Sequence, residues 1–159
     1  MTRLLHIFID ADGCPVKQEV YRVARRHGLR VTLVANAVMS APRADWIELI
    51  VVCDDPDAAD NWIAEHVGRN DIVISADIPL ASRCLEKEAR VLRPNGREFR
   101  ESTIGDALAR REILSHLRDQ GVMTGGPPPF AKQDRSRFLQ ALERVVQACL
   151  KDARNDRAS

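Results

Sequence analysis

Short apolar runs alternate with amphipathic stretches through the first 92 residues of the chain. Between the runs, apolar residues recur every three or four positions, as Val16, Val20 and Val23 do, which indicates helices. The apolar runs that predict buried strands are residues 4–9, 30–35, 46–53, 71–75 and 89–92. This alternation predicts an α/β fold, a three-layer α/β/α sandwich with a mainly parallel sheet.

Prolines and glycines mark the ends of the predicted helices. Pro15 suits the first turn of a helix, and Gly28 suits the position just after its C-terminus. Asp54 and Asp55 precede Pro56, an acidic cap followed by a proline, which indicates another helix start. The first and third strands are therefore each followed closely by a helix.

The last third of the chain predicts a hairpin and two helices. The turn at 94–96 favours a small hairpin returning through 97–99. Apolar residues recur at helical spacing in 102–121 and again from residue 134 onward, on either side of the Gly- and Pro-rich loop 124–129. We expect both helices to cover the apolar surface that the sheet leaves open.

Composition is that of one globular domain, with 45% hydrophobic and 30% charged residues among 159. We expect this domain to span residues 1–150 and the polar residues 151–159 to form a frayed tail. The 24 basic and 23 acidic residues give a net charge of +1. The overall charge therefore does not indicate a nucleic-acid-binding protein, although balanced totals can hide separate charged patches.

The cysteines and the apolar runs bear on metal binding and localisation. Cys14, Cys53, Cys84 and Cys149 are scattered, with no Cys-x-x-Cys pair, which argues against a structural zinc site. No apolar run approaches the length of a membrane span, and the N-terminus lacks the pattern of a signal peptide. We therefore expect a cytoplasmic protein without membrane contact.

Acidic and polar residues follow several of the predicted strands. In a parallel sheet, the C-terminal ends of the strands lie on one edge, so these residues are brought together. They are Asp10 and Asp12 after the first strand, Asn36 after the second, Asp54, Asp55 and Asp57 after the third, and Ser75 and Asp77 after the fourth. Clustered carboxylates repel one another unless a cation lies between them, and Mg²⁺ or Mn²⁺ suits oxygen ligands. Metal-assisted phosphodiester hydrolysis is therefore the hypothesis.

Each acid also has a structural interpretation. Asp54, Asp55 and Asp77 precede helices and are typical N-caps, each contributing about 1 kcal/mol. Asp57 and Asp60 are three residues apart on one helix and are typical of a solvated face. Asp10 directly ends a buried strand, which makes a purely structural role harder to assign to it.

Three other groups have two interpretations. Cys14 lies at a helix N-terminus, where a thiolate is favoured, but a small packed residue there explains it as well. Lys17, in the first turn, suits either a phosphate or solvent. Arg110 and Arg111, beside Arg97, form either a basic strip for a nucleic-acid backbone or a solvated helix face.

Several motifs, in order, resemble the YaiI/YqxD family of uncharacterised bacterial proteins. They are DADGCPVK at 10–17, VAN at 34–36, DAADNWI at 57–63, DIVISADIPLA at 71–81, and GPPPF at 126–130 followed by Asp134-Arg135. The resemblance covers nearly the whole chain up to about residue 145. This family is usually placed with the PIN-like nucleases. The resemblance therefore implies a PIN-like domain and a metal-dependent ribonuclease acting on single-stranded RNA.

The resemblance also implies roles for individual residues. Asp10, Asp60 and Asp77 would be the metal-binding and catalytic acids, with Asp57 as an alternative or partner to Asp60. Asp12 and Asp134 would be additional groups particular to the family, Asp12 a further catalytic residue. Gly13 and Ser75 are small departures, since the family more often has Ala and Thr there.

Two other functions remain open. An Asp-x-Asp after the first strand, with Ser75 later, also resembles phosphatases of the haloacid dehalogenase type, in which Asp10 would be a nucleophile. The acidic pair expected late in such a chain is missing, since Asp54 and Asp55 precede Ser75. The other possibility is a non-catalytic RNA-binding protein that keeps the fold without turnover.

Overall fold

A single sheet of six strands forms the centre of the protein. The structure is a computed structural model that describes residues 5–55, 57–122 and 129–158. The strands lie side by side in the order β3-β2-β1-β4-β5-β6, and all neighbours are parallel except β5 and β6. Their bounds are β1 His6–Asp10, β2 Arg30–Ala35, β3 Ile47–Val51, β4 Ile72–Ile74, β5 Arg90–Leu92 and β6 Glu98–Phe99. The predicted parallel sheet is confirmed, and so is the predicted hairpin, which β5 and β6 form at one side of the sheet.

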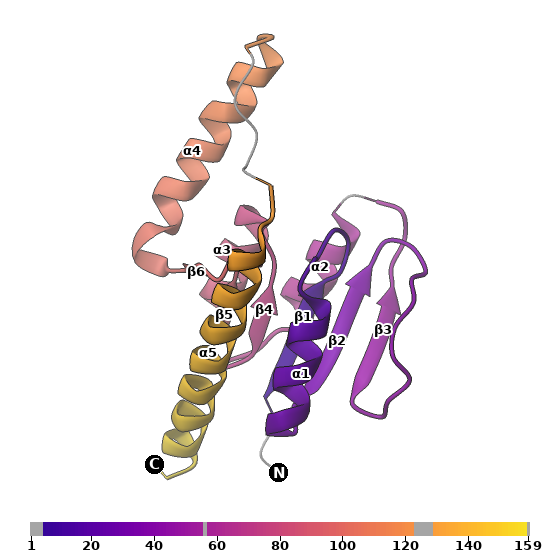
Figure 1. Ribbon diagram of the computed structural model, residues 1–159. Coiled ribbons are helices and arrows are strands. Elements are labelled where there is room, and N and C mark those ends of the chain that lie inside the picture. Colours follow the sequence, from indigo (N-terminus) through magenta and orange to yellow (C-terminus); the bar gives the residue numbers. More distant parts are fainter. Residues whose placement is uncertain (1–4, 56, 123–128, 159) are drawn as a thin grey trace.

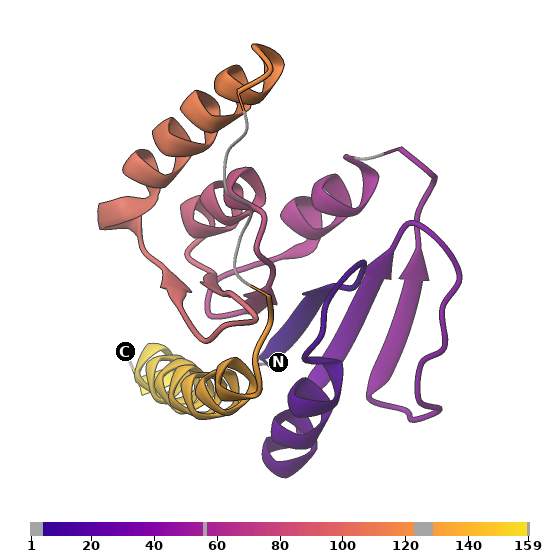
Figure 2. The ribbon, with the colours of Figure 1, turned by 45° about the horizontal axis from the view of Figure 1, so that its top comes forward.

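Helices cover both faces of this sheet, which confirms the three-layer α/β/α sandwich. The helices are α1 Lys17–His27, α2 Ala58–His66, α3 Ile78–Glu86, α4 Glu101–Asp119 and α5 Lys132–Ala158. Helices α1 and α5 pack on one face and α2 and α3 on the other (Figures 1 and 2). No helix in the described part of the chain is long and apolar enough to cross a membrane.

Strand β1 contributes to both cores because successive side chains point to opposite faces. Ile7 and Ile9 are fully buried in the core beneath α1 and α5, whereas Phe8 lies in the core beneath α2 and α3. The apolar run at the start of the chain is therefore a central strand, as its uninterrupted hydrophobicity predicts.

The expectation that both C-terminal helices cover the sheet holds for α5 and is wrong for α4. Helix α5 buries Phe138 and Leu142 completely, but none of residues 101–119 is buried. Only Ile104, at its start, packs against a core, and the rest of α4 extends away from the sheet (Figure 1). Ile104 and Ile113 are nine residues apart, about two and a half turns, so they lie on opposite sides of the helix. The apolar residues therefore do not form one stripe.

Two other segments differ from the expectation or lie outside it. Helix α5 continues to Ala158, where the sequence predicts a frayed tail, and Asp156 accepts hydrogen bonds from Arg69 at 3.4 Å and Asn70 at 3.2 Å. Most of the predicted loop 124–129, and Pro56, the proline of the predicted helix start, lie outside the described residues.

The contrast between α4 and α5 predicts how much each contributes to stability. Leu142→Ala removes a side chain that is 0% exposed in α5, and we expect it to lower the free energy of unfolding by about 2–5 kcal/mol. Ile113→Ala on α4, where the side chain is 61% exposed, should change it by less than about 0.5 kcal/mol. Urea denaturation followed by circular dichroism measures both, and equal losses would contradict the assignment of α5 to the core.

Candidate functional site

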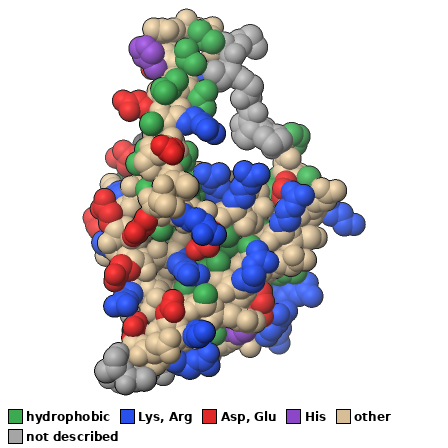
Figure 3. All heavy atoms as spheres, turned by 90° about the vertical axis from the view of Figure 1, so that its left-hand side faces the viewer, with side chains coloured by type: hydrophobic (Ala, Val, Ile, Leu, Met, Phe, Trp, Pro, Cys, Tyr) green, Lys and Arg blue, Asp and Glu red, His purple; other side chains and the backbone are tan. Residues whose placement is uncertain are grey.

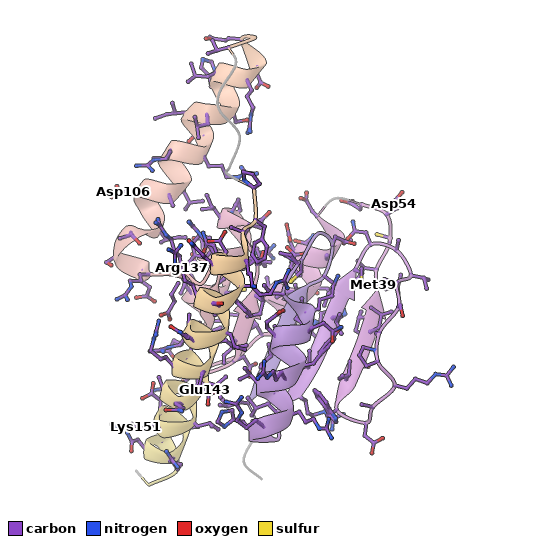
Figure 4. All side chains as sticks on the ribbon, in the orientation of Figure 1. Met39, Asp54, Asp106, Arg137, Glu143 and Lys151 are labelled. Carbon is purple, nitrogen blue, oxygen red and sulfur yellow. The ribbon has the colours of Figure 1, made fainter. Side chains whose placement is uncertain are left out.

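Three neighbouring strands end at one edge of the sheet and carry the predicted residues there. Asp10, the last residue of β1, is paired with Val34 of β2, and Ile9 is paired with Ile74 of β4. Asn36 and Ser75, which follow β2 and β4 closely, therefore lie beside Asp10 at this edge. Figure 4 labels Asp54 at the same end of the molecule, beyond β3.

A serine hydroxyl links two of the predicted acids. The Ser75 hydroxyl donates to Oδ2 of Asp10 at 3.0 Å and accepts the backbone N–H of Asp77 at 3.0 Å. Ser75 is only 3% exposed, so its geometry is fixed by packing. Oδ1 of Asp77 accepts the Leu80 N–H at 2.8 Å and caps α3. Asp77 is therefore the predicted helix cap, yet it also lies within the acidic cluster.

Burial and like charges raise the pKa of two carboxyls at this edge. The pKa of Asp10 is raised mainly by burial and further by Asp77 and Asp12, while the Ser75 hydrogen bond acts in the opposite direction. The pKa of Asp60 is raised to about 6, first by burial and then by the charges of Asp77, Asp10 and Asp57, with Arg83 opposing.

Asp60 is thus electrostatically coupled to Asp10 and Asp77, although it lies on a different element, the first turn of α2. The topology brings all three acids to one region. Among the described residues, none of the three forms an ion pair with a basic side chain. In the described part of the chain, the one basic side chain that opposes this negative charge is Arg83, which acts on Asp60 without forming an ion pair with it.

The donor set fits a hard divalent cation with open coordination positions. No three carboxylate, imidazole or thiolate groups in the described ranges converge closely enough to enclose a metal ion. Mg²⁺ does not require such an enclosure, because proteins commonly hold it by one or two carboxylates together with water and substrate phosphates. Asp10 and Asp77, connected through Ser75, supply two such carboxylates.

Asp12 and Asn36 connect loops at the edge of the site. Oδ2 of Asp12 accepts the backbone N–H of Asn36 at 2.9 Å, and the Asn36 side-chain amide donates to the carbonyl of Asp55 at 3.0 Å. Asp55 in turn accepts the N–H of Asp57 at 2.9 Å, but Asp57 is the N-cap of α2, so the N-cap role expected of Asp54 and Asp55 is wrong. Asp57 is exposed at the start of α2 and makes no capping bond with its side chain.

The remaining predicted residues at this edge make local contacts. Asp134 accepts the N–H of Ala131 at 2.9 Å and lies 3.6 Å from Arg137, so it stabilises the start of α5. Lys17 is the first residue of α1 and is half-buried. Burial raises the pKa of the Cys14 thiol, and Cys14 packs against the core, which supports packing over reactivity.

The basic residues divide into two groups. Arg97 and Arg110 line the same hollow, between the β5–β6 hairpin and α4, while Arg111 lines a different one on α4. Lys and Arg side chains are numerous on the face of the molecule where α4 joins the body (Figure 3). Arg93 also lines the first hollow and is absent from the residues predicted above. Arg93 could have been identified from the sequence, because it directly follows the predicted strand 89–92. It therefore lies at the same edge of the sheet as Asp10 and Ser75.

The sequence is similar to one family of known proteins over most of its length. The sequence profile of the family described as uncharacterised YaiI/YqxD matches residues 8–148. A UPF0178 protein of Paramagnetospirillum magneticum is 59% identical over 140 residues, which are 88% of this chain and 93% of that protein. A UPF0178 protein of Rhodospirillum rubrum is 51% identical over 145 residues, covering 91% and 97% of the two chains.

The raised pKa of Asp60 predicts how stability depends on pH in metal-free protein. The folded state binds a proton on Asp60 more tightly than the unfolded state, so stability falls as pH rises from about 4 to about 6. Asp60→Asn removes the ionised group, and we expect it to stabilise the protein at pH 7 by about 1 kcal/mol, allowing for solvent screening. The gain should vanish near pH 4. Thermal melts in EDTA measure it.

Asp54→Asn is the matched control, because Asp54 is an exposed acid on the same edge. It should leave the pH profile of the melting temperature unchanged. Destabilisation of Asp60→Asn at pH 7, or an equal gain in Asp54→Asn, would contradict the electrostatic account of the cluster.

Proposed function

The chain belongs to the YaiI/YqxD family, and we propose that it is a divalent-metal-dependent nuclease that hydrolyses phosphodiester bonds of single-stranded RNA. The observation that carries this proposal is the hydrogen-bonded series Asp10–Ser75–Asp77, with Asp60 electrostatically coupled to it. Such a group of carboxylates, which form no ion pair with the described basic side chains, suits a cation and its phosphate ligand at the C-terminal edge of a parallel sheet. A PIN-like identity of the domain is part of the same proposal.

In this proposal, Asp10 and Asp77 would hold the cation, Mg²⁺ or Mn²⁺, together with water and substrate phosphate. Asp60 would add negative charge nearby without being one of a closed set of three ligands. When bound, such an ion would lower the pKa of a coordinated water and neutralise charge that develops on the phosphate. Ser75 fixes the orientation of the Asp10 carboxylate through its hydroxyl. Hydrogen bonds of this kind to ligating carboxylates set their position.

Asp12 acts in this proposal as a positioning residue. Its hydrogen bond to the Asn36 N–H connects the loop after β1 to the end of β2, and Asn36 extends the connection to Asp55. The loop that follows Asp10 is thereby held in place. The charge of Asp12 also raises the pKa of Asp10, which favours a cation at that carboxylate.

The proposal predicts Mn²⁺- or Mg²⁺-dependent cleavage of unstructured RNA that depends on Asp10. Asp10→Asn should reduce the cleavage rate on the order of 100-fold, because it removes a charge that the metal and the transition state require. Ser75→Ala should reduce it about 10-fold, since the carboxylate remains but is no longer oriented. Gel analysis of a fluorescent oligoribonucleotide measures the rates.

The control is Asp54→Asn, an exposed acid outside the hydrogen-bonded series, which should cleave at the parental rate. EDTA should abolish cleavage in every variant. Cleavage by Asp10→Asn at the parental rate would overturn the acidic site. Binding of RNA without metal-dependent cleavage by the parent would instead support the non-catalytic RNA-binding alternative.

A further inference from the structure

A hollow next to the acidic edge has three arginines among its lining residues. It has a volume of about 250 Å³ and lies between the β5–β6 hairpin and the first half of α4. Arg93, Arg97 and Arg110 line it together with Thr103, whose hydroxyl donates to the Arg100 carbonyl at 3.4 Å. The volume is about eight times the ~30 Å³ share of one water molecule, which leaves room for a phosphate and part of its sugar.

Arg93 is held in a fixed orientation within this hollow. Its guanidinium lies 4.1 Å from the centroid of the Phe99 ring, a cation–π contact. The hairpin that carries it is closed by the hydrogen bond from the Arg93 N–H to the Arg97 carbonyl, at 2.8 Å. A guanidinium with a fixed plane suits bidentate contact with a phosphate, and less rotamer freedom is lost on binding.

The hairpin itself is fixed against α5. Gly96, at its turn, has a φ of +90°, and a β-carbon there would lie 2.8 Å from the carbonyl carbon of Arg137. The turn therefore contacts the backbone of α5 directly, and a side chain would push it away. The arginines of the hairpin are thus presented from a rigid support.

The charge of the hollow is positive. Three guanidinium groups face two carboxylates, Glu98 and Asp106, and Glu98 already lies 3.8 Å from Arg90 in an ion pair. Burial, and to a lesser degree the neighbouring Arg97, lower the pKa of Arg93. A bound anion would stabilise the charged form of Arg93 and so oppose the effects of burial and of Arg97 on its pKa, as expected of an anion-binding site.

The hollow lies on the same sheet edge as the acids. Arg93 directly follows β5, and Ser75, which contacts Asp10, donates its N–H to the Leu92 carbonyl of β5 at 3.2 Å. Neighbouring strands are about 4.8 Å apart, so Arg93 is about 10 Å from the strand of Asp10. One extended strand of nucleic acid can contact both places.

We infer that Arg93, Arg97 and Arg110 bind a backbone phosphate of single-stranded nucleic acid, a short distance along the strand from the phosphodiester at the acidic edge. This inference rests on the proposed function for the position of the cleaved bond. The arginines determine how the strand lies across the edge and contribute affinity that depends on salt.

The test is the salt dependence of binding, measured without cleavage. A fluorescent 12-nucleotide oligouridine is titrated with full-length protein in EDTA, from about 50 to 200 mM salt, by fluorescence anisotropy. Arg97→Gln changes an exposed side chain and should weaken binding several-fold, reducing the slope of log Kd against log salt by about 0.7. Arg93→Gln should do the same.

Two further variants separate charge from folding. Asp106→Asn removes a negative charge that lines the hollow and should tighten binding, an effect that structural damage would not produce. Arg43→Gln changes an exposed arginine in the loop before β3, at the opposite side of the sheet, and should leave the slope unchanged.

Several outcomes would overturn the inference. They are an unchanged slope in both Arg93→Gln and Arg97→Gln, an equal change in Arg43→Gln, or weaker binding by Asp106→Asn. Competition by uridine monophosphate or inorganic phosphate as strong as that by the 12-mer would show that the ligand is a small phosphate. Failure of the proposed function would look different. The protein would still bind the oligonucleotide in EDTA with the salt dependence described, but it would show no metal-dependent cleavage.

Discussion

The parallel pairing of β1 with β2 and β4 is the constraint on which the site depends. It fixes Asp10 at the level where β2 and β4 also end, so that Ser75 reaches its carboxylate. The register is held by two hydrophobic cores, because β1 contributes Ile7 and Ile9 to one and Phe8 to the other. A shift by one residue would exchange these faces and carry Asp10 away from Ser75.

The same edge carries charge of opposite sign at neighbouring strands. At the end of β1 and in the first turn of α2, burial and the repulsion of neighbouring carboxylates raise the pKa values of Asp10 and Asp60. At β5, arginines gather around Phe99 with fewer acids than they would need for neutrality. The acids and the arginines each therefore retain unfavourable electrostatic energy, which ion pairs between the two groups would relieve. Sites that bind cations and phosphates commonly carry such a cost in stability.

The parts of the site that follow from topology could be predicted from the sequence. Asp10, Ser75 and Asp77 each lie within three residues of a strand end, and the alternation of strands and helices is enough to bring them together. The capping role of Asp77 was also visible, since it precedes Pro79. The hydrogen bond of Asp12 to Asn36 could not be predicted, because it depends on the path of a loop.

Long-range packing decided the other differences. Helix α4 has the apolar content of a packed helix, but its apolar residues point to two sides, so it buries none of them. Arg111 lies next to Arg110 in sequence, yet a rotation of about 100° on the helix directs it to another hollow. Arg93 gains its importance from Phe99 and from α4, elements that follow it in the chain.

The central claim is that the acidic edge binds a divalent cation, and a crystal soaked in Mn²⁺ tests it most directly. The account predicts anomalous difference density between Asp10 and Asp77, with carboxylate oxygens at about 2.1 Å. Absence of such density at this edge, in a crystal where Mn²⁺ is bound elsewhere, would contradict the claim.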